Sequence, residues 1–264
     1  MVVVGIDVGS ISTEAVVLDP GRRVLAAVVR PTGARGREAA RQALAQALEE
    51  AKVPSREVAR VVATGYGRQR LEFAQRTVTE ISAHARGAFF LFPAARTVID
   101  IGGQDSKVIR LDANGAVLDF AMNDKCAAGT GRFLEVMAGA LEVDLEAFAA
   151  LAEQTRKAAP ITSTCTVFAE SEVVSLLAQG TEAAAVARGL AEAVAGRVGG
   201  LVQQVGLVRE VVLSGGVAKN AAAVAALRRR LGVPITVTAE PQTVGALGAA
   251  LIALGDTLAA GGTA

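Results

Sequence analysis

The sequence contains an internal repeat, and this repeat restricts the possible folds more than any other feature. An apolar stretch, a glycine turn and a returning apolar hairpin occur around GIDVGS and again around VIDIGGQD. Asp7 corresponds to Asp100 and Asp19 corresponds to Asp112, and the members of each pair lie 93 residues apart. Solenoid repeats have periods of about 20–50 residues, so this period is too long for a solenoid. The repeat instead predicts two related lobes that face each other across a cleft, each offering a glycine-rich turn with an acidic residue.

The rest of the chain has the pattern of an α/β protein. Apolar runs bounded by glycine predict strands, and stretches with apolar residues on one face predict helices. The expected elements are a hairpin over 14–30 with Pro20-Gly21 at its turn, helices over 37–52 and 79–91, a strand over 58–65, a second hairpin followed by a mostly helical region, a strand–turn–helix over 209–232, a short strand over 234–239 and a closing helix. We place the first lobe at residues 1–94 and the second at 95–264, with the last helix, about 241–264, packing back on the first lobe.

Composition and charge exclude several classes of protein. A formal net charge of +1 and an aromatic content of 3% argue against a nucleic-acid-binding surface. Two cysteines are too few for the disulfide framework of a small secreted protein. The N-terminus lacks the basic segment of a signal peptide, and the apolar stretch PQTVGALGAALIALG is expected to be too short to span a bilayer. We therefore expect a cytoplasmic protein with neither a nucleic acid nor a membrane as its partner.

Three glycine turns have the composition of phosphate-binding loops. They are Gly9-Ser10, Gly102-Gly103-Gln104 and Gly215-Gly216, and Ser12 and Thr13 add hydroxyl groups to the first. Glycine lets backbone N–H groups approach phosphate oxygens closely, and the start of a helix adds partial positive charge. None of the turns matches GxxxxGK[ST] or GxGxxG, so neither a Walker nor a Rossmann site is expected.

Asp7 and Asp100 immediately precede the first two turns. Because carboxylates and phosphates repel each other, we expect these residues to hold a Mg²⁺ ion or its waters, which would bridge the phosphates. Gln104 resembles a group that positions water more than it resembles a base. The three turns in this order indicate the actin-like ATPase fold of sugar kinases and Hsp70, with two phosphate loops and one adenosine loop.

The two cysteines lie in polar, glycine-rich contexts at the start of predicted helices: Cys126 in NDKCAAGTGRF and Cys165 in TSTCT. A helix N-terminus favours a thiolate, and Lys125 adds a positive charge beside the first cysteine. Closed zinc and iron–sulfur sites generally take four ligands, and a twofold dimer would supply four thiolates. The alternative is that both cysteines are small buried hydrophobic residues.

Six motifs together resemble one family. GIDVGS, ATGYGR, VIDIGGQD, NDKCAAGTGRF, STCTVFAESEV and SGGVAKN occur in this order over nearly the whole chain, and the motif around Cys126 is the most specific. The sequence resembles the BadF/BadG/BcrA/BcrD ATPase family, in particular the ATP-dependent activators of 2-hydroxyacyl-CoA dehydratases. The resemblance implies an ATPase that a ferredoxin or flavodoxin reduces. The reduced ATPase would inject a single low-potential electron into a dehydratase, with ATP gating the transfer.

The resemblance also implies the site residues. A homodimer would hold one [4Fe–4S] cluster through Cys126 and Cys165 of both chains. ATP and Mg²⁺ would lie near Asp7, Gly9, Ser10, Ser12, Thr13, Asp100, Gly102, Gly103 and Gln104, with Asp7, Asp100 and Gln104 as the catalytic residues. The adenosine would lie near Gly215, Gly216 and Asn220.

The first phosphate turn departs from the family pattern, which usually reads Asp-x-Gly-Ser-Thr-x-Thr-Lys. A threonine is replaced by Ile11 and a lysine by Glu14. The second change puts a negative charge where a positive one could meet phosphate. Our hypothesis is that Glu14 points to solvent, where its charge would not oppose nucleotide binding.

Other residues receive plainer interpretations. His84, the one histidine, is expected to be a packed or interlobe residue. Glu170 and Glu172 suit the positive start of the helix after Cys165, although one of them could reach a ribose. Arg228–Arg230 would form a solvated last helical turn, and Tyr66-Gly67-Arg68 has no role that we can derive.

Other functions stay open at this point. The chain could serve a benzoyl-CoA reductase-type enzyme or another double-cluster reductase. It could also be a small-molecule kinase of the same fold, although a kinase needs a general base and no clear candidate is present. An actin-like structural protein would need no cysteines.

Overall fold

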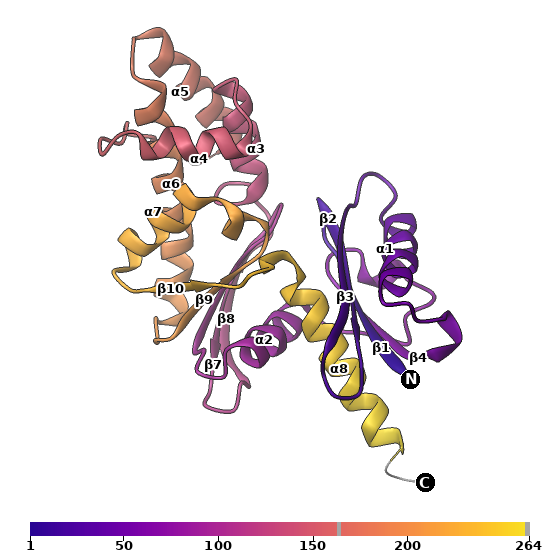
Figure 1. The fold of residues 1–264 in the computed structure, drawn as a ribbon. Helices are drawn as coiled ribbons and strands as arrows, with labels where there is room; N and C mark the ends of the chain where they lie inside the picture. The colour runs from indigo at the N-terminus through magenta and orange to yellow at the C-terminus, as the bar shows by residue number, and fades with distance from the viewer. Residues whose placement is uncertain (163–164, 262–264) are drawn as a thin grey trace. The chain divides into compact units, whose positions relative to one another are not determined.

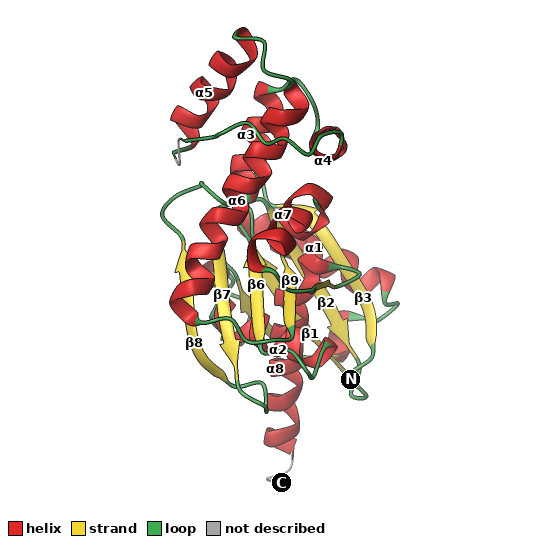
Figure 2. Ribbon diagram, turned by 90° about the vertical axis from the view of Figure 1, so that its left-hand side faces the viewer, coloured by secondary structure: helices red, strands yellow, loops and turns green. Residues whose placement is uncertain are grey.

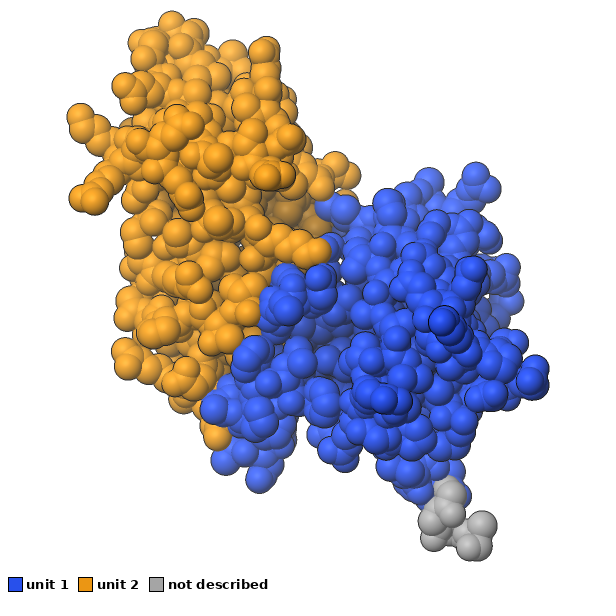
Figure 3. Space-filling view, in the orientation of Figure 1, with its two compact units in different colours: residues 1–95, 111–118, 238–264 blue, residues 96–110, 119–237 orange. Residues whose placement is uncertain are grey.

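The computed structural model describes residues 1–162 and 165–261, which form ten strands and eight α-helices. The strands make two five-stranded sheets, and helices cover both (Figures 1 and 2). Two compact units are present: unit 1 comprises residues 1–95, 111–118 and 238–264, and unit 2 comprises residues 96–110 and 119–237 (Figure 3). Each unit is described by itself below.

The elements follow the expected order. The first sheet contains β1 (Val2–Val8), β2 (Ser12–Leu18), β3 (Val24–Pro31), β4 (Val58–Thr64) and β5 (Arg76–Thr77), and its helices are α1 (Gly36–Glu50), α2 (Glu80–Leu91) and α8 (Val244–Gly261). The second sheet contains β6 (Thr97–Ile101), β7 (Ser106–Leu111), β8 (Val117–Asn123), β9 (Val211–Ser214) and β10 (Ile235–Val237). Its helices are α3 (Gly131–Ala140), α4 (Leu145–Glu153), α5 (Thr166–Ala178), α6 (Ala183–Val205) and α7 (Ala221–Leu231).

The two sheets have the same topology. Their strand orders are β3-β2-β1-β4-β5 and β8-β7-β6-β9-β10. In each sheet the central strand pairs antiparallel with its hairpin partner and parallel with the strand on its other side. The repeat read from the sequence is therefore a repeat of structure.

Asp19 and Asp112 also play equivalent parts. The Oδ1 atom of Asp19 accepts a hydrogen bond from the backbone N–H of Arg23 (2.9 Å), and Oδ1 of Asp112 accepts one from that of Ala116 (2.8 Å). Each aspartate thus closes the turn of the hairpin that follows the glycine turn through a hydrogen bond to the residue four positions later. This shared role explains why the same residue type recurs at the same offset.

The first sheet is covered on both faces. One face packs on α1 through Val4, Ile6 and Val8, and the other packs on α8 through Val3, Val16 and Val62. Contact with α8 requires glycine on β1, because a Cβ atom on Gly5 would overlap the carbonyl oxygen of Ala246. The start of α8 is therefore fixed against the end of β1 that carries Asp7.

The sequence argument that the C-terminal apolar stretch is too short for a membrane was wrong. Residues 241–260 are helical, and by length and composition alone they could cross a bilayer. However, 61% of the most apolar window is buried inside the protein, and α8 packs against α2, β1, β2 and β4. This burial identifies α8 as a core helix of unit 1.

The core of unit 2 lies between its sheet and the long helix α6. One face of α6 is buried along most of its length, and α3, α4 and α7 pack on it. Helix α5 packs on α3 and α6 (Figure 1). The loops that carry both cysteines lead into helices of this layer.

Candidate functional site

Asp7 is buried at the end of β1, and two glycines allow it to be there. A Cβ atom on Gly65 would overlap Oδ1 of Asp7, and a Cβ atom on Gly245 would overlap Oδ2. Gly65 also has a φ of +89°, which L side chains rarely adopt. Both the close packing against Asp7 and the positive φ therefore require glycine at position 65, in the motif ATGYG. His84 lies beside the same carboxylate, with Nε2 3.7 Å from Oδ2 of Asp7. The expectation that His84 is a packed residue agrees with this burial.

Glu14 is only 4% exposed, so the hypothesis that it points to solvent was wrong. It lies directly opposite Asp7 in the register of β1 and β2, and opposite residues of an antiparallel pair share a face of the sheet. Thr64 lies opposite Asp7 on the other side, on β4. Its Oγ1 atom is buried and has no hydrogen-bond partner among the described residues. A row of polar side chains with two carboxylates therefore crosses the buried sheet beside the first glycine turn.

The first glycine turn is held by Thr32 at the end of β3. Thr32 donates its hydroxyl to the carbonyl oxygen of Gly9 (2.9 Å) and its backbone N–H to that of Ile11 (2.8 Å). The hydroxyl of Thr13 lies 2.8 Å from that of Thr32, and Thr13 is fully buried. Thr13 therefore fixes the turn through Thr32, whereas Ser10 and Ser12 are half-buried beside it.

Asp100 is buried at the end of β6, and both of its carboxylate oxygens are engaged. Ser214 donates its hydroxyl to Oδ1 (3.0 Å), and Nζ of Lys107 lies 3.1 Å from Oδ2. Lys107 is 1% exposed and also lies 2.7 Å from Oδ2 of Asp105. The sequence motifs did not identify Lys107, Asp105 and Ser214 as site residues. The hairpin register was the signal that could have found Lys107, because it places this lysine opposite Asp100.

Lys107 and Glu14 occupy equivalent positions in the two repeats. They lie 93 residues apart, as Asp7 and Asp100 do, and each faces the aspartate of its own repeat. The side chain at this position therefore carries opposite charge in the two units. A carboxylate lies opposite the aspartate in unit 1, and an ammonium group lies opposite it in unit 2.

The second glycine turn is bonded to the start of α3. The backbone N–H of Gly102 donates to the carbonyl oxygen of Asp105 (3.0 Å) and closes the turn. The carbonyl oxygens of Gly102 and Gly103 accept hydrogen bonds from the backbone N–H groups of Gly131 (2.9 Å) and Arg132 (2.8 Å). N–H groups at the start of a helix have no partner within the helix, and here the turn supplies one. Gln104 is exposed on this turn.

The third turn follows β9. Gly215 has a φ of +85°, and a Cβ atom there would lie 2.7 Å from Oδ1 of Asp100. Gly215 therefore brings the third turn against Asp100, and Gly216 begins the short helical turn that follows. Asn220 caps α7 by accepting a hydrogen bond from the N–H of Ala223 (3.0 Å), and its amide nitrogen donates to the carbonyl oxygen of Leu145 (3.3 Å). Both ends of the Asn220 side chain are thus engaged within unit 2.

Both cysteines are free thiols, one at the start of a helix and one in the loop before a helix. Cys165 is the N-cap residue of α5 and is exposed, whereas Cys126 is half-buried four residues before Thr130, the N-cap of α3. The amide of Asn123 donates to the carbonyl oxygen of Cys126 (2.8 Å), and the hydroxyl of Thr130 donates to that of Ala127 (2.6 Å). The described residues of one chain contain no group of three or more histidine, cysteine or acidic side chains that could hold a metal ion. Two thiolates per chain therefore fit an iron–sulfur group only if a second copy supplies the other two.

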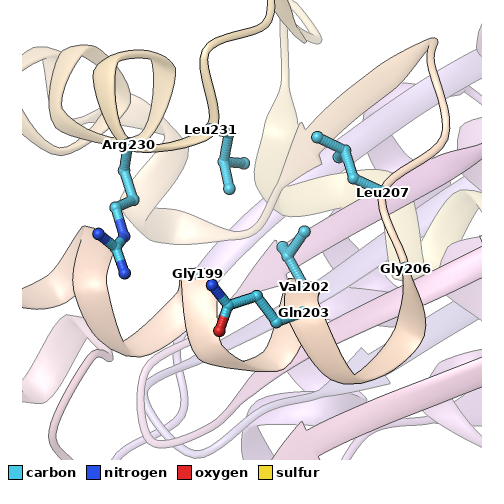
Figure 4. Close-up of a pocket in the computed structure, with 7 residues that line it drawn as sticks. All are labelled: Gly199, Val202, Gln203, Gly206, Leu207, Arg230 and Leu231. Carbon is cyan, nitrogen blue, oxygen red and sulfur yellow. The ribbon is translucent and has the colours of Figure 1, made fainter.

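A separate hollow lies between α6 and α7, and none of the predicted site residues lines it (Figure 4). It has a volume of about 400 Å³, and Arg230 extends from the end of α7 across α6 at Gly199 (Figure 4). The neighbouring arginines are engaged, since Arg228 donates to the carbonyl oxygen of Ile235 and Arg229 pairs with Glu192. The three arginines are exposed, as the sequence predicts for a solvated last turn.

The sequence matches the model of the BadF/BadG/BcrA/BcrD ATPase family over residues 4–253. It is 51% identical to the activator of lactoyl-CoA dehydratase of Anaerotignum propionicum over 96% of this chain and 97% of that protein. It is 47% identical to the (R)-2-hydroxyglutaryl-CoA dehydratase activating ATPase of Acidaminococcus fermentans over 94% of this chain and 95% of that protein.

The fold is also that of solved structures. An activator of the 2-hydroxyisocaproyl-CoA dehydratase from Clostridium difficile with bound ADPNP superimposes with a TM-score of 0.94, at 41% identity over 100% of this chain and 98% of that chain. A ROK hexokinase from Thermus thermophilus, 22% identical, gives a TM-score of 0.54 over 98% of this chain and 100% of that chain, and shows the fold alone. The predicted actin-like α/β ATPase fold is therefore confirmed.

Proposed function

Because the chain belongs to the BadF/BadG/BcrA/BcrD ATPase family, we propose that it is the ATP-hydrolysing activator of a 2-hydroxyacyl-CoA dehydratase. In this role it delivers a single low-potential electron to the dehydratase, and ATP gates the delivery. Support comes from relatives named as activators of such dehydratases, which are 47–51% identical over nearly the whole chain. A related activator was solved with bound ADPNP, which supports a nucleotide site here.

The nucleotide is assigned to the three glycine turns. Backbone N–H groups of the Gly9 and Gly102–Gly103 turns hold phosphate oxygens, together with the hydroxyl groups of Ser10 and Ser12. The turn at Gly215–Gly216 holds the adenosine. Asp7 and Asp100 would hold a Mg²⁺ ion through its waters, and the ion would supply positive charge to the phosphates. Gln104, which is exposed on its turn, orients the attacking water.

The electron carrier is assigned to the cysteines. Cys126 and Cys165 of two copies of the chain would hold one [4Fe–4S] group, which supplies a one-electron carrier when bound. Helix α5 begins directly after Cys165, and α3 begins five residues after Cys126. Lys125 adds a further positive charge beside Cys126. The protein then works as a cytoplasmic homodimer that receives electrons from a ferredoxin or a flavodoxin.

The observation that carries the proposal is the bonding between the second glycine turn and α3. The carbonyl oxygens of Gly102 and Gly103 accept the first N–H groups of the helix that follows the Cys126 loop. A change at the phosphates therefore reaches this loop through two hydrogen bonds. A small-molecule kinase of the same fold would not need such a connection, nor two free thiols.

Anaerobic purification tests the proposal. We expect a brown dimer that absorbs near 400 nm and contains about four iron atoms per dimer. The double variant Cys126→Ser/Cys165→Ser should lose the iron and remain folded. With ATP, the wild-type protein should pass electrons to a 2-hydroxyacyl-CoA dehydratase. A monomer that keeps its iron, or iron that the double variant retains, would contradict the assignment.

A further inference from the structure

We infer that Glu172 is a positioning residue for Cys165: its carboxylate anchors Thr162, three residues before this cysteine, to the helix that the cysteine begins. Neither the helix-start nor the ribose interpretation of Glu172 foresaw this role. The inference rests on the proposed function, because it concerns how Cys165 is presented to an iron–sulfur group.

The anchor consists of three hydrogen bonds to one residue. The backbone N–H of Thr162 donates to Oε1 (2.9 Å) and Oε2 (3.2 Å) of Glu172, and the hydroxyl of Thr162 donates to Oε1 (2.8 Å). Glu172 lies in the second turn of α5, and only two residues separate Thr162 from Cys165. Both carboxylate oxygens are thus engaged with Thr162, which disfavours a ribose contact.

The chain before Thr162 is held by different contacts. The N–H of Ala159 donates to the carbonyl oxygen of Ala185 (2.8 Å), and Arg188 donates to that of Thr155 (2.8 Å). These bonds attach the segment to α6. Within the described residues, the hydrogen bonds between Thr162 and Glu172 are the last ones before Cys165. The chain is thus bonded to α6 up to Ala159 and to α5 at Thr162.

Cys165 depends on this attachment because its own contacts are few. Its side chain is exposed and makes no capping hydrogen bond to the described part of α5. The position of its sulfur is therefore set by the backbone. Helix α5 follows Cys165, and Thr162, which Glu172 holds, lies three residues before it. Without the carboxylate, the thiolate would sample more positions, and an iron–sulfur group would be held less firmly.

Glu170 provides a matched control. It has the same charge and lies on the same helix, two residues nearer to Cys165. It is exposed, and among the described residues it forms no hydrogen bond or ion pair. Glu170→Ala therefore removes a carboxylate five residues from Cys165 without removing the anchor. A purely electrostatic effect of Glu172 would be reproduced by Glu170→Ala, whereas an anchoring effect would not.

The experiment measures the rate at which a ferrous chelator removes iron from the anaerobically purified dimer. We expect Glu172→Ala to lose iron at least about fivefold faster than wild type, since hydrogen bonds to a charged acceptor are among the stronger ones. Glu170→Ala should match wild type. Thr162→Val, which keeps the N–H bonds and removes the hydroxyl, should lose iron about twofold faster. Glu172→Gln, which can still accept from Thr162, should lie between wild type and Glu172→Ala.

Thermal unfolding of the iron-free proteins, followed by circular dichroism, separates anchoring from a general loss of stability. If Glu172→Ala does not fold, the comparison of Thr162→Val and Glu172→Gln with Glu170→Ala decides the matter. Equal rates of iron loss in all variants would overturn the inference and leave the proposed function intact. A wild-type protein without iron would overturn the proposed function and the inference with it.

Discussion

The backbone N–H of Gly131 donates a hydrogen bond to the carbonyl oxygen of Gly102 over 2.9 Å. The next residues along each segment are bonded in the same way, since the backbone N–H of Arg132 donates to the carbonyl oxygen of Gly103 (2.8 Å). In addition, the hydroxyl of Ser106 donates to the carbonyl oxygen of Gly129 (2.7 Å). Three hydrogen bonds thus join the second glycine turn and β7 to the start of α3 and to the loop that carries Cys126. The turn and the loop cannot move independently unless these bonds break.

Gly131→Ala should weaken the coupling between nucleotide and electron transfer. A Cβ atom at Gly131 would lie 3.2 Å from the carbonyl oxygen of Gly102 and 3.4 Å from Cα of Gly103, so the turn and the helix must move apart slightly. A cost of about 1 kcal/mol in the coupled state would reduce ATP-dependent electron transfer about fivefold. Electron transfer and ATP hydrolysis are measured on the same preparation. Gly139→Ala on the same helix is the control, because a Cβ atom there contacts none of the described residues within 4 Å. Equal losses in both variants would contradict the coupling role of Gly131.

Asp100→Asn should abolish ATP turnover while the protein stays folded. The change removes the charge proposed to hold Mg²⁺, and loss of metal stabilisation of the transition state predicts a decrease of at least about 100-fold. The buried Lys107 keeps Asp105 as a partner at 2.7 Å, so it is not left without a counter-charge. Steady-state phosphate release measures the turnover. Asp112→Asn is the control, since an asparagine oxygen can accept the same turn hydrogen bonds as Asp112. Normal hydrolysis by Asp100→Asn would mean that this turn does not bind the phosphates.

Glu14→Lys should tighten ATP binding. The substitution places a lysine opposite Asp7, as Lys107 lies opposite Asp100 in the other repeat. It removes a buried negative charge beside the proposed phosphate site and adds a positive one, and we expect the Kd for ATP to fall about tenfold, which is about 1.4 kcal/mol. Glu14→Gln removes only the charge and should give a smaller decrease. Isothermal titration calorimetry with MgATP measures the Kd of wild type and of both variants. Weaker binding by both variants would show that Glu14 itself contributes to the nucleotide site.

Gly245→Ala should destabilise the protein, because its Cβ atom would overlap Oδ2 of Asp7 and lie 2.9 Å from Nε2 of His84. Overpacking of a buried contact costs about 1–3 kcal/mol. Gly255→Ala on the same helix should be neutral or stabilise the protein by up to about 1 kcal/mol, because a Cβ atom there contacts none of the described residues within 4 Å and alanine favours helix. Urea unfolding measures both changes. If the two variants are equally stable, α8 does not press on Asp7 as the structure describes.

The sequence predicted the fold more completely than it predicted the contacts of the site residues. Glycine turns and apolar periodicity are local, and they predicted both hairpins and the order of the helices. The two-residue strand β5 escaped notice because Arg76-Thr77 is too short to show any periodicity. The hydrogen bonds of Asp19 and Asp112 follow from turn chemistry within four residues, and for that reason the repeat was visible in the sequence.

The environment of the charged residues could not be predicted in the same way. Glu14 and Lys107 are charged residues that directly follow Thr13 and Ser106 in sequence, and charged residues are seldom fully buried. Their burial depends on what covers the sheet, and this information is not local. The Glu172 anchor was missed for a similar reason, because a hydrogen bond across ten residues and out of a helix leaves no periodic signal. Sequence thus indicated which residues are unusual but not which partners they have.

The last prediction is that ATP gates electron transfer rather than phosphorylating a substrate. The proposed path is short, since Gly102 is bonded to Gly131 and the Cys126 loop lies between β8 and α3. Moving a two-state equilibrium from 1:99 to 99:1 takes roughly 5.5 kcal/mol. At about 59 mV per decade for one electron, four decades correspond to roughly 240 mV, which is enough to change the reducing power of a bound centre substantially. Electron transfer to the cognate dehydratase should therefore be measured with ATP, with ADP, with a non-hydrolysable analogue and without nucleotide. We expect transfer with ATP and little without nucleotide. Equal transfer in all four conditions would rule out gating and leave a plain iron–sulfur carrier.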